Sequence, residues 1–441
     1  MSMQSLRERK HGFLFHRTLR AAAIVSAAAV LPAWTSSTAL ADADWRQFRG
    51  PNGQGRAETR GLPLTWSETE NIAWKSPIPG KGWSSPVVLG NDIWITTALD
   101  GGKSLRAVCV DLDSGAMRHN VEVFTPTEPV SINEKNSHAS PSPVIEPGRV
   151  YVHFGAMGTA CLDAGSGRVL WRNHELVIDH KEGPGSSPIL FEDLLIVNCD
   201  GQDKQYVVAL DKRSGEIVWK TNRSAPFREQ ADFRKAYSTP IVIQVDGRRQ
   251  LISAGADQVQ SYDPRTGREL WRVRYQGFSN VPVPLFEDGM VYLCTGYTAP
   301  ELWAIRANGT GDVTETHVVW KFKRQVPSNP SPVLWEGRIY LAGDRGVATC
   351  VDAKTGALVW QERLGDNYTA SPICAENRIY FASEGGKVTV VEPGAKFRVL
   401  ASNLLDGRMM ATAAVAGNSL IFRTADHLYC VQRSPGAAAS R

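Results

Sequence analysis

A nine-residue phrase recurs in this chain: Asp, two residues, Ser or Thr, Gly, three residues and Trp. Four copies keep this internal spacing, and they end at Trp171, Trp219, Trp271 and Trp360. Together they extend over roughly half of the chain. Self-similarity of this kind indicates a repeat architecture, in which each unit buries its apolar face against the next unit.

We interpret the phrase as a turn followed by an apolar wedge. The Asp accepts backbone hydrogen bonds in a tight hairpin turn, and the Gly takes the positive φ that the turn requires. The Trp then packs flat between neighbouring sheets. In one unit His119 stands at the Trp position. The residues assigned to this structural role are Asp163, Gly167, Trp171, Asp211, Gly215, Trp219, Asp263, Gly267, Trp271, Asp352, Gly356 and Trp360, with Trp74 and Trp320 from less regular units.

A second phrase, Ser-Pro followed by an apolar run, a short polar turn and another apolar strand, precedes the first. Its anchor residues are Pro86, Pro143, Pro188, Pro240, Pro284, Pro332, Pro372 and, in a degenerate last copy, Ala413. Successive anchors are 40 to 57 residues apart. Short strands at this interval, separated by Gly, Pro and Asp turns, predict four-stranded antiparallel propeller blades. The predicted fold is therefore an all-β, eight-bladed β-propeller.

The last unit shows how the ring closes. It ends near Val431 after three strands, whereas Trp74 stands twelve residues before Pro86. Trp320 and Trp360 stand at the same distance before the anchors that follow them. We therefore expect the N-terminal strand to pair into the last blade, which leaves no free sheet edge at the ring junction. The alternative is seven blades with an unrelated N-terminal strand.

The beginning of the chain predicts export. Residues 1–20 are basic, residues 21–34 are apolar, and a small-x-small cleavage site follows at 39–41. This order is typical of a secretory leader, and the apolar stretch is shorter than the ~20 residues of a membrane span. The first Cys of the chain is Cys109, far beyond this stretch, so a lipid anchor is not expected. The predicted parts are a leader at 1–41, an entry segment at 42–70, the propeller at 71–433 and a disordered tail at 434–441.

Charge narrows the classes of partner. Five of the 49 basic residues and one of the 45 acidic residues lie in the leader, so 44 of each remain. A protein of balanced charge has no long-range field for nucleic acid or an anionic membrane. We expect a monomer in the periplasm or outside the cell, with a protein or polymer partner.

The seven cysteines include no C-x-x-C motif, no haem-attachment motif and no two adjacent cysteines. Cys109, Cys161 and Cys350 each stand two residues before a repeat Asp, where Ala209 and Ser261 stand in other units. A position that alternates Cys, Ala and Ser is small and buried. We therefore expect buried free thiols there.

The longest predicted loops lie on one face, at 120–141, 172–186 and 220–238, between the first four blades. Because propeller function usually resides in such loops, this face is the candidate binding face; variation without function is the alternative. Its candidate residues are His138, His174, Asp179, His180, Arg228, Asp232, Arg234 and Lys235. The spacing of the histidines fits no metal motif, so no catalytic or metal-binding residue is assigned.

Two further sets of loop residues have competing interpretations. Acidic residues recur between the second and third strands of the units, at Asp100, Asp200, Asp257, Asp344, Glu384 and Asp426. A carboxylate ring suits Ca²⁺, but acids beside glycine are also ordinary turn residues. The loop aromatics Phe227, Phe233 and Tyr237 could bind a carbohydrate or another polymer, or could pack within their loop.

The A-x-D-x-x-[ST]-G-x-x-x-W phrase at 209–219 resembles the pyrroloquinoline-quinone (PQQ) enzyme repeat. With W-R-Q-F-R-G-P-N-G-Q-G at 45–55 and P-L-T-W-S-E-T-E-N-I-A-W-K at 63–75, the mature chain resembles the secreted PQQ-like β-propeller family of the quinoprotein alcohol dehydrogenase-like superfamily. The resemblance implies a propeller. It leaves function open, because the phrase encodes blade packing in catalytic and non-catalytic members alike.

The resemblance implies two functional models. In quinoprotein alcohol dehydrogenases PQQ lies over Ca²⁺ in the channel, with an Asp base. In the outer-membrane assembly lipoprotein the propeller is a scaffold. This chain has neither an adjacent cysteine pair nor a lipobox cysteine. We expect a non-catalytic, extracytoplasmic binding or scaffold protein without an assigned cofactor; the alternative is a PQQ-dependent dehydrogenase that uses PQQ and Ca²⁺.

Overall fold

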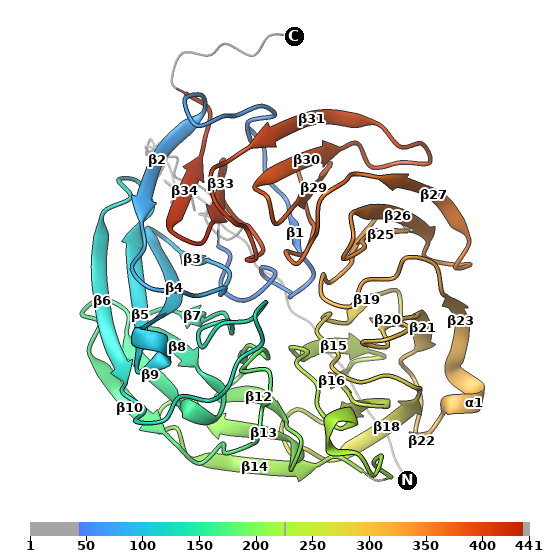
Figure 1. The fold of residues 1–441 in the computed structure, drawn as a ribbon. Helices are drawn as coiled ribbons and strands as arrows, with labels where there is room; N and C mark the ends of the chain where they lie inside the picture. The colour runs from blue at the N-terminus through green and yellow to red at the C-terminus, as the bar shows by residue number, and fades with distance from the viewer. Residues whose placement is uncertain (1–43, 225, 435–441) are drawn as a thin grey trace, which may run out of the picture. The chain divides into compact units, whose positions relative to one another are not determined.

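The computed structural model describes residues 44–224 and 226–434, which form eight sheets arranged around a central axis (Figure 1). The predicted leader at 1–41 lies outside the described residues, as does the tail from 435 onward. Each sheet is one blade, with its first strand at the centre of the ring and its fourth strand at the periphery (Figure 1).

The first four blades follow the chain in order. Blade 1 is β3 (Val87–Leu89), β4 (Asp92–Leu99), β5 (Ser104–Asp111) and β6 (Met117–Phe124). Blade 2 is β7 (Val144–Glu146), β8 (Arg149–His153), β9 (Thr159–Asp163) and β10 (Val169–Asn173). Blade 3 is β11 (Ile189–Phe191), β12 (Leu194–Asp200), β13 (Gln205–Asp211) and β14 (Ile217–Asn222). Blade 4 is β15 (Ile241–Val245), β16 (Arg248–Gly255), β17 (Gln258–Tyr262) and β18 (Glu269–Arg274).

The remaining blades complete the ring. Blade 5 is β19 (Leu285–Glu287), β20 (Met290–Cys294), β21 (Leu302–Arg306) and β23 (Val318–Phe322). Blade 6 is β24 (Val333–Trp335), β25 (Arg338–Ala342), β26 (Val347–Asp352) and β27 (Leu358–Arg363). Blade 7 is β28 (Ile373–Ala375), β29 (Arg378–Ala382), β30 (Lys387–Val391) and β31 (Val399–Leu404). Blade 8 is β32 (Ala414–Ala416), β33 (Ser419–Arg423), β34 (His427–Val431) and β2 (Ile72–Pro77).

The closure of the ring follows the sequence prediction. β2 pairs antiparallel with β34, and Trp74 lies opposite Cys430. The N-terminal strand therefore becomes the outer strand of the last blade, so the eight-bladed prediction is confirmed and the seven-bladed alternative is wrong. Two short strands join blades in parallel: β1 (Arg56–Ala57) joins β28, and β22 (Gly311–Asp312) joins β18.

The repeated turn has the predicted hydrogen bonds. Asp163 Oδ1 accepts from the backbone N–H of Ser166 at 2.8 Å and from its hydroxyl at 2.7 Å. The Gly167 N–H donates to the Asp163 carbonyl at 2.9 Å, and Gly167 has φ +71°. A side-chain acceptor and a residue without Cβ therefore close the hairpin together.

Every repeat Trp except Trp271 docks on the turn of the following blade. The indole N–H of Trp171 donates to the Lys212 carbonyl at 3.1 Å. A Cβ added to Gly215 in that turn would lie 2.5 Å from the Trp171 ring. The same pairing joins Trp74 to Leu112, Trp219 to Pro264, Trp320 to Ala353 and Trp360 to Gly394. The repeat Gly therefore serves its own turn and also receives the neighbour's indole.

Blades 1 and 4 depart from this pairing. His119 stacks on Trp94, and its Nε2 donates to the Gly165 carbonyl at 3.0 Å, so it replaces the missing Trp. Trp271 is fully buried and donates instead to Gln250 Oε1 of its own blade at 2.7 Å. The next blade has a longer turn, which places β22 beside β18 and leaves no tight turn for Trp271.

The small position before the repeat Asp lies directly opposite the Trp across the third and fourth strands. Cys161 faces Trp171, Ala209 faces Trp219, and Cys350 faces Trp360. A large indole on one strand requires a small partner on the next, which explains the alternation of Cys, Ala and Ser. All seven cysteines are free and buried.

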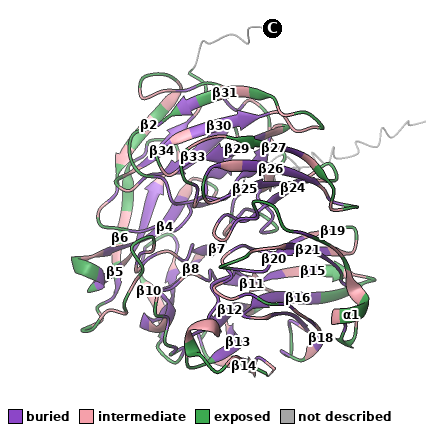
Figure 2. Ribbon diagram, turned by 45° about the vertical axis from the view of Figure 1, so that its right-hand side comes forward, coloured by how far each residue is buried: buried purple, intermediate pink, exposed green. Residues whose placement is uncertain are grey.

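Burial decreases from the inner strands toward the periphery, where buried and exposed residues alternate (Figure 2). Apolar clusters lie between neighbouring blades; one joins β33 and β34 of blade 8 to β29 of blade 7 and β4 of blade 1. The described residues contain a single α-helix, α1 (Thr314–His317), of four residues. No described helix has the length and hydropathy that a membrane crossing requires.

Candidate functional site

A ring of hydroxyl groups surrounds the channel at the start of the blades. Each Ser or Thr of the Ser-Pro phrase accepts a hydrogen bond from the backbone N–H of its counterpart in the preceding blade. Seven blade junctions have this bond, at 2.8 to 3.0 Å, and its acceptors are Ser142, Ser187, Thr239, Ser331, Ser371, Thr412 and Ser85. The sequence analysis treated these residues only as strand markers.

The eighth junction, between blades 4 and 5, differs because Val283 occupies the hydroxyl position. There the hydroxyl of Ser238 donates to the Pro282 carbonyl at 2.8 Å and bridges the gap. Hydroxyl groups thus link all eight blades around the channel, with a side chain that accepts at seven junctions and one that donates at the eighth.

The entry segment closes one end of the channel. The backbone of Trp45 exchanges two hydrogen bonds with Val88 of blade 1, at 2.8 and 2.9 Å. Gln54 bonds to Pro284 and Phe286 of blade 5, and β1 then joins blade 7. In Figure 1 the blue chain that leads to β1 lies at the centre of the ring. Residues 45–57 therefore form a plug across the channel.

Arg49 is the centre of this plug. Its side chain is fully buried and donates to the carbonyls of Pro332 and Pro372, in blades 6 and 7. Burial lowers the pKa of Arg49 to about 9, with nearby Arg56 contributing. A Cβ on Gly50 would lie 2.8 Å from the Trp45 ring, and one on Gly55 would lie 2.6 Å from Arg49. The glycines of W-R-Q-F-R-G-P-N-G-Q-G therefore make room for this plug.

The other end of the channel is open and forms a cavity of about 1250 Å³. Its base includes Phe48 of the plug and the hydroxyl ring. Its walls come from the loops between blades at 133–142, 181–187, 232–239, 278–281, 323–331 and 369–371, with 297–301 and 343–345 from loops within blades. This is the predicted long-loop face, but the cavity also uses blades 5 to 7.

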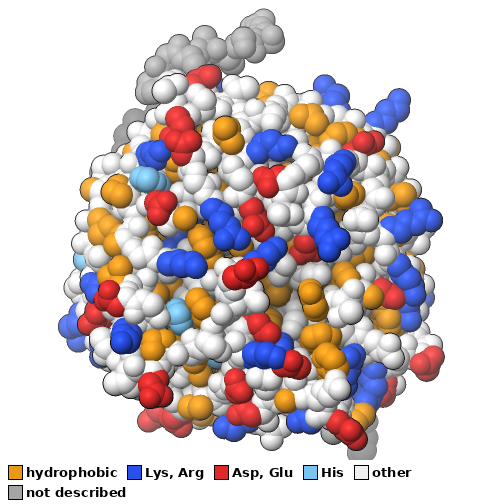
Figure 3. Space-filling model, in the orientation of Figure 1, with side chains coloured by type: hydrophobic (Ala, Val, Ile, Leu, Met, Phe, Trp, Pro, Cys, Tyr) orange, Lys and Arg blue, Asp and Glu red, His pale blue; other side chains and the backbone are white. Residues whose placement is uncertain are grey.

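Most charged groups that line the cavity form ion pairs. The ammonium of Lys235, whose side chain is 4% exposed, lies 2.9 Å from Glu182 and 3.3 Å from Asp232. Lys323 pairs with Glu301 at 2.9 Å. Figure 3 shows both signs of charge intermingled over the face of the Figure 1 view. The cavity therefore has polar walls without an uncompensated charge of one sign.

Aromatic residues occupy two parts of the wall. Phe233, Phe278 and Tyr297 form one group, with ring centroids 4.7 Å apart for the first pair and 6.0 Å apart for the second. We call these three residues the aromatic platform. Trp83 and Tyr237 line the cavity separately. The hydroxyl of Tyr237 donates to the His180 carbonyl at 3.0 Å and to Glu182.

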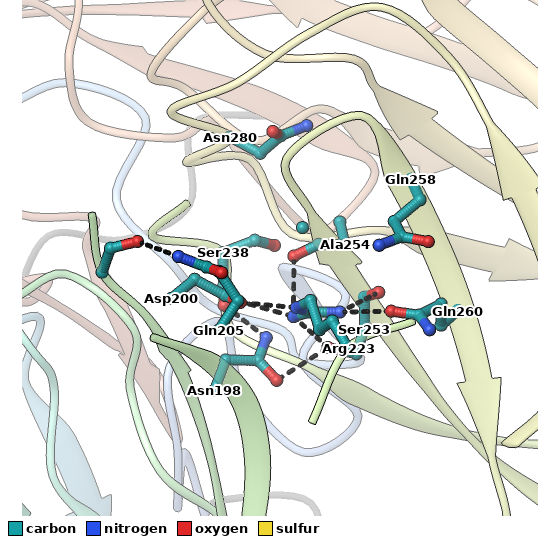
Figure 4. Close-up of polar contacts among 12 residues, drawn as sticks. Asn198, Asp200, Gln205, Arg223, Ser238, Ser253, Ala254, Gln258, Gln260 and Asn280 are labelled. Carbon is teal, nitrogen blue, oxygen red and sulfur yellow. Dashed lines mark hydrogen bonds and ion pairs between the residues drawn. The ribbon is translucent and has the colours of Figure 1, made fainter. Parts of the chain in front are cut away.

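A buried polar network supports the loop at 224–240 (Figure 4). Arg223 donates to both oxygens of Asp200, at 2.5 and 2.7 Å, and to the hydroxyl of Ser253 at 2.7 Å. Asn198 donates to the Ser238 carbonyl at 2.8 Å. Burial raises the pKa of the Asp200 carboxyl, although Arg223 opposes the shift. This network ties blade 3 to blade 4 and, through Ser238, holds the loop that carries Phe233 and Lys235.

Of the eight predicted face residues, Asp232 and Lys235 line the cavity. Arg228 pairs with Asp257, and Arg234 donates to the carbonyls of Arg228 and Glu229. These two arginines therefore organise the loop around the platform.

The three predicted histidines do not come together as a site. His138 bonds to the Val130 carbonyl at 2.9 Å, and His174 is exposed and packs edge-on against Phe124. His180 is buried, and its Nε2 accepts from the Ala156 N–H at 2.9 Å. Burial lowers the pKa of His180 to about 4. Exposed Asp179 accepts from Gln202 at 3.2 Å.

The predicted loop aromatics and acids have separate places. Phe233 and Tyr237 line the cavity, whereas Phe227 is half-buried outside its lining. Asp344 accepts from the N–H groups of Ser328 and Asn329, at 2.7 and 3.1 Å, in the loop that leads to β24. Glu384 accepts from Thr369 and Arg408, and Asp200 is the buried partner of Arg223. Asp257 accepts from the Gly277 N–H at 3.0 Å. These four acids thus anchor neighbouring loops or pair with a basic side chain.

The sequence analysis did not identify the residues that complete the cavity. Phe278 and Tyr297 stand in separate loops of blades 4 and 5, and Trp83 precedes the first Ser-Pro phrase. The aromatic character of these loop residues was the available signal. Their convergence depends on the ring.

Sequence comparison identifies the family. The profile of the family described as outer membrane protein assembly factor BamB matches residues 62–221 and 203–439. The chain belongs to this family. No curated protein matches the chain by sequence.

Solved structures of low sequence identity share the fold. BamB from Moraxella catarrhalis is 14% identical, with TM-score 0.58, over 81% of this chain and 99% of that one. A europium-containing methanol dehydrogenase is 12% identical, with TM-score 0.55, over 88% of this chain and 90% of that one. Quinohemoprotein alcohol dehydrogenase from Comamonas testosteroni is 11% identical, with TM-score 0.53, over 90% of this chain and 82% of that one. These likenesses, all below 25% identity, establish the fold, a PQQ-like β-propeller.

The cavity residues do not fit a calcium-held quinone. Within residues 44–224 and 226–434, no three His, Cys, Asp or Glu side chains are grouped as metal ligands. Glu182, Asp232 and Glu301 face lysines, and Asp344 holds backbone N–H groups. Hard cations take six or more oxygen ligands, and these carboxylates point to separate partners. We derive no catalytic step through such a group.

Proposed function

We propose that this protein is an exported, non-catalytic binding or scaffold protein that engages its ligand or partner through the cavity of the long-loop face. The observation that carries the proposal is a cavity of about 1250 Å³ with walls made of inter-blade loops and a base closed by the plug. Large concave sites with a few convergent polar groups are the usual binding sites of proteins.

The family supports a binding role over a catalytic one, because its description is that of an assembly factor. The cavity supports it independently. Its principal ionisable groups are engaged in ion pairs or in loop anchoring, whereas an acid or base poised for catalysis must reach a reacting atom.

The proposed parts of the chain are a leader at 1–41, an entry segment at 42–70, the propeller at 71–433 and a tail at 434–441. Export places the mature protein in the periplasm or outside the cell. We propose that it is a monomer there. The entry segment then acts as the plug. N-terminal sequencing of the exported protein tests the boundary; a mature protein that begins at Met1 would contradict the proposed leader.

The function is tested by titration of the mature protein with PQQ and Ca²⁺, followed by absorbance and by dye-linked alcohol oxidation. We expect neither a spectral change nor turnover. Saturable binding with alcohol oxidation would overturn the proposal in favour of a PQQ-dependent dehydrogenase.

A second experiment locates the binding face. A photo-crosslinking residue replaces Glu134 at the cavity wall or Val218 on the outer strand of blade 3, where the side chain is exposed. We expect adducts in the cell envelope with the first variant only. Equal labelling by both variants, or labelling only at position 218, would show that the long-loop face is not the binding face.

A further inference from the structure

The aromatic platform stands beside neutral hydrogen-bonding groups on one wall of the cavity. Phe233 ends the short 3₁₀ helix η4 (Ala231–Phe233), Phe278 lies in the loop between blades 4 and 5, and Tyr297 lies in the loop after β20. The side chain of Tyr297 is the most open of the three, because this residue is 60% exposed. An apolar ring held at the edge of a polar cavity is available for stacking.

From this arrangement we propose that the cavity binds a neutral oligosaccharide, whose sugar rings stack on the aromatic platform. The proposal rests on the function proposed above and names the class of its ligand. Aromatic side chains combine a large apolar area with low conformational freedom. The weakly polar C–H face of a pyranose ring matches such a surface.

The platform is organised before any ligand binds. The Tyr297 N–H donates to the Phe278 carbonyl at 2.7 Å, and the Ser279 N–H donates to the Lys235 carbonyl at 2.7 Å. The guanidinium carbon of Arg228 lies 5.2 Å from the ring centroid of Phe233 and 5.8 Å from that of Phe278. These contacts fix loops from three parts of the chain, which lowers the ordering cost of binding.

Strained backbone marks the same wall. Thr298 has φ +85° and Ser279 has φ +50°. Positive φ at a β-branched residue is a genuine outlier, and strain of this kind persists at ligand sites where the surrounding structure imposes it. Thr298 follows Tyr297 directly, and Ser279 follows Phe278, so the strain accompanies the platform itself.

The charge of the cavity selects a neutral ligand. Lys135, Lys181, Lys235, Lys323 and Arg345 line it with Glu134, Glu182, Asp232, Glu301 and Asp344, which is five charges of each sign. An anionic polymer would require a surplus of Lys and Arg, since long-range attraction follows the net charge. A neutral ligand with many hydroxyls requires instead donors and acceptors that can exchange roles.

Such groups are present next to the platform. Ser279 and Thr298 directly follow Phe278 and Tyr297, and Gln325 lines the same cavity from another loop. Within the described part of the chain, the side-chain polar groups of these three residues have no protein hydrogen-bond partner. Hydroxyl and amide side chains both donate and accept, as sugar hydroxyls do. The volume of about 1250 Å³ exceeds the 300–1,000 Å³ that is typical of small-molecule sites. It therefore suits several sugar units and not a single monosaccharide.

The test is isothermal titration calorimetry of the mature protein with three neutral hexasaccharides at millimolar concentration: cellohexaose, chitohexaose and maltohexaose. We expect saturable binding of at least one. Tyr297→Ala should weaken that binding about tenfold through the loss of stacking, whereas Tyr297→Phe should retain it. Because Tyr297 is exposed, the variant is not expected to impair folding, which circular dichroism verifies.

Leu404→Ala, an exposed apolar truncation on the outer strand of blade 7, is the matched control and should bind like the parent protein. Binding of none of the three hexasaccharides overturns the proposal, as does equal binding by Tyr297→Ala. A preference for the anionic polymer alginate, or for an unstructured neutral peptide of similar length, also overturns it.

These outcomes are separate from those of the proposed function. If crosslinking at position 134 succeeds while every hexasaccharide fails, the binding face stands and the ligand class is wrong. If both fail, the proposed function is wrong as well.

Discussion

At the scale of single residues, the repeat glycines carry two constraints at once. Gly267 has φ +69°, and a Cβ there would lie 2.5 Å from the Trp219 ring and 2.6 Å from the Thr221 hydroxyl. Gly247, in the turn between β15 and β16, has φ +78° but no heavy atom within 4 Å of the same added atom. The two positions therefore separate backbone strain from steric contact.

We expect Gly247→Ala to lower the free energy of unfolding by about 1–2 kcal/mol, from backbone strain alone. Gly267→Ala should cost about 1–3 kcal/mol more, because the indole of the preceding blade must also move. Urea denaturation followed by circular dichroism measures both. Equal losses would show that the Trp–Gly contact adds nothing beyond the turn.

Buried histidines make stability depend on pH. Burial lowers the pKa of His180 from 6.5 to about 4 and, with a contribution from His180, that of His153 to about 3. The unfolded chain takes up these protons near pH 6.5, whereas the folded chain does not. The histidine contribution to stability is therefore constant above about pH 6.5 and falls as the pH drops toward about 4.

Each histidine should contribute a slope of about 1.4 kcal/mol per pH unit in this window. His180→Gln should show a shallower loss of stability between about pH 6.5 and about pH 5 than the parent protein. The exposed residue His174 provides the control, and His174→Gln should keep the parent slope. The measurement is the urea midpoint at each pH; parallel profiles for the parent and His180→Gln would contradict the assignment.

At the scale of elements, the Ser-Pro phrase joins blades as well as starting strands. The Ser331 hydroxyl accepts from the Val283 N–H at 3.0 Å across the junction of blades 5 and 6. One junction earlier, Val283 offers no acceptor to Thr239, and the Ser238 hydroxyl bridges the blades instead. The ring of hydroxyls is thus interrupted at one identified residue.

Ser331→Ala should destabilise the fold by about 1–3 kcal/mol, because the buried Val283 N–H loses its acceptor. Val283→Thr should stabilise it by about 0.5–1 kcal/mol, since a Thr hydroxyl completes the ring, as Thr239 and Thr412 do elsewhere. Thermal and urea unfolding of the two variants test this pair. A destabilising Val283→Thr would show that the apolar contact of Val283 outweighs the missing bond.

At the scale of the whole molecule, closure of the ring makes the blades depend on one another. The seven cysteines lie in blades 1, 2, 3, 5, 6, 7 and 8, and all are buried and free. Burial raises the pKa of each thiol. Reaction with a thiol reagent therefore requires opening of the structure.

We expect no rapid reaction of the native protein with Ellman's reagent, and seven reactive thiols in guanidinium chloride. Under native conditions all seven should react slowly at one common rate, since a closed ring opens as a unit. A subset that reacts faster, resolved by mass spectrometry, would show that individual blades open on their own.

The sequence predicted the blades well because their determinants are local. The turn phrase needs only Asp, Ser or Thr and Gly within five residues, as Asp163 and Gly167 show. The Trp needs only the equivalent turn of the next unit. Ring closure through Trp74 followed from the same spacing, because β2 stands before its first anchor as the other fourth strands do.

The candidate site was predicted only in part. Asp232 and Lys235 belong to one loop and line the cavity, whereas His138 and His174 hold or cover loops elsewhere. A polar loop residue carries no signal for whether it faces the axis or the outer surface. For the loop that carries Asp232 and Lys235, the anchoring contacts come from two blades: Asn198 of blade 3 holds Ser238, and Arg223 binds Asp200 and Ser253.

The sequence by itself determined the repeat, the number of blades, the small buried position before the repeat Asp and the strand that closes the ring. Each of these features depends on residues that are close in sequence within one unit, or on residues at equivalent positions in successive units. Only the tertiary structure decided that residues 45–57 plug the channel, that Arg49 joins blades 6 and 7, and that Phe233, Phe278 and Tyr297 meet. These contacts join residues far apart in the chain, and the closed ring brings them within reach.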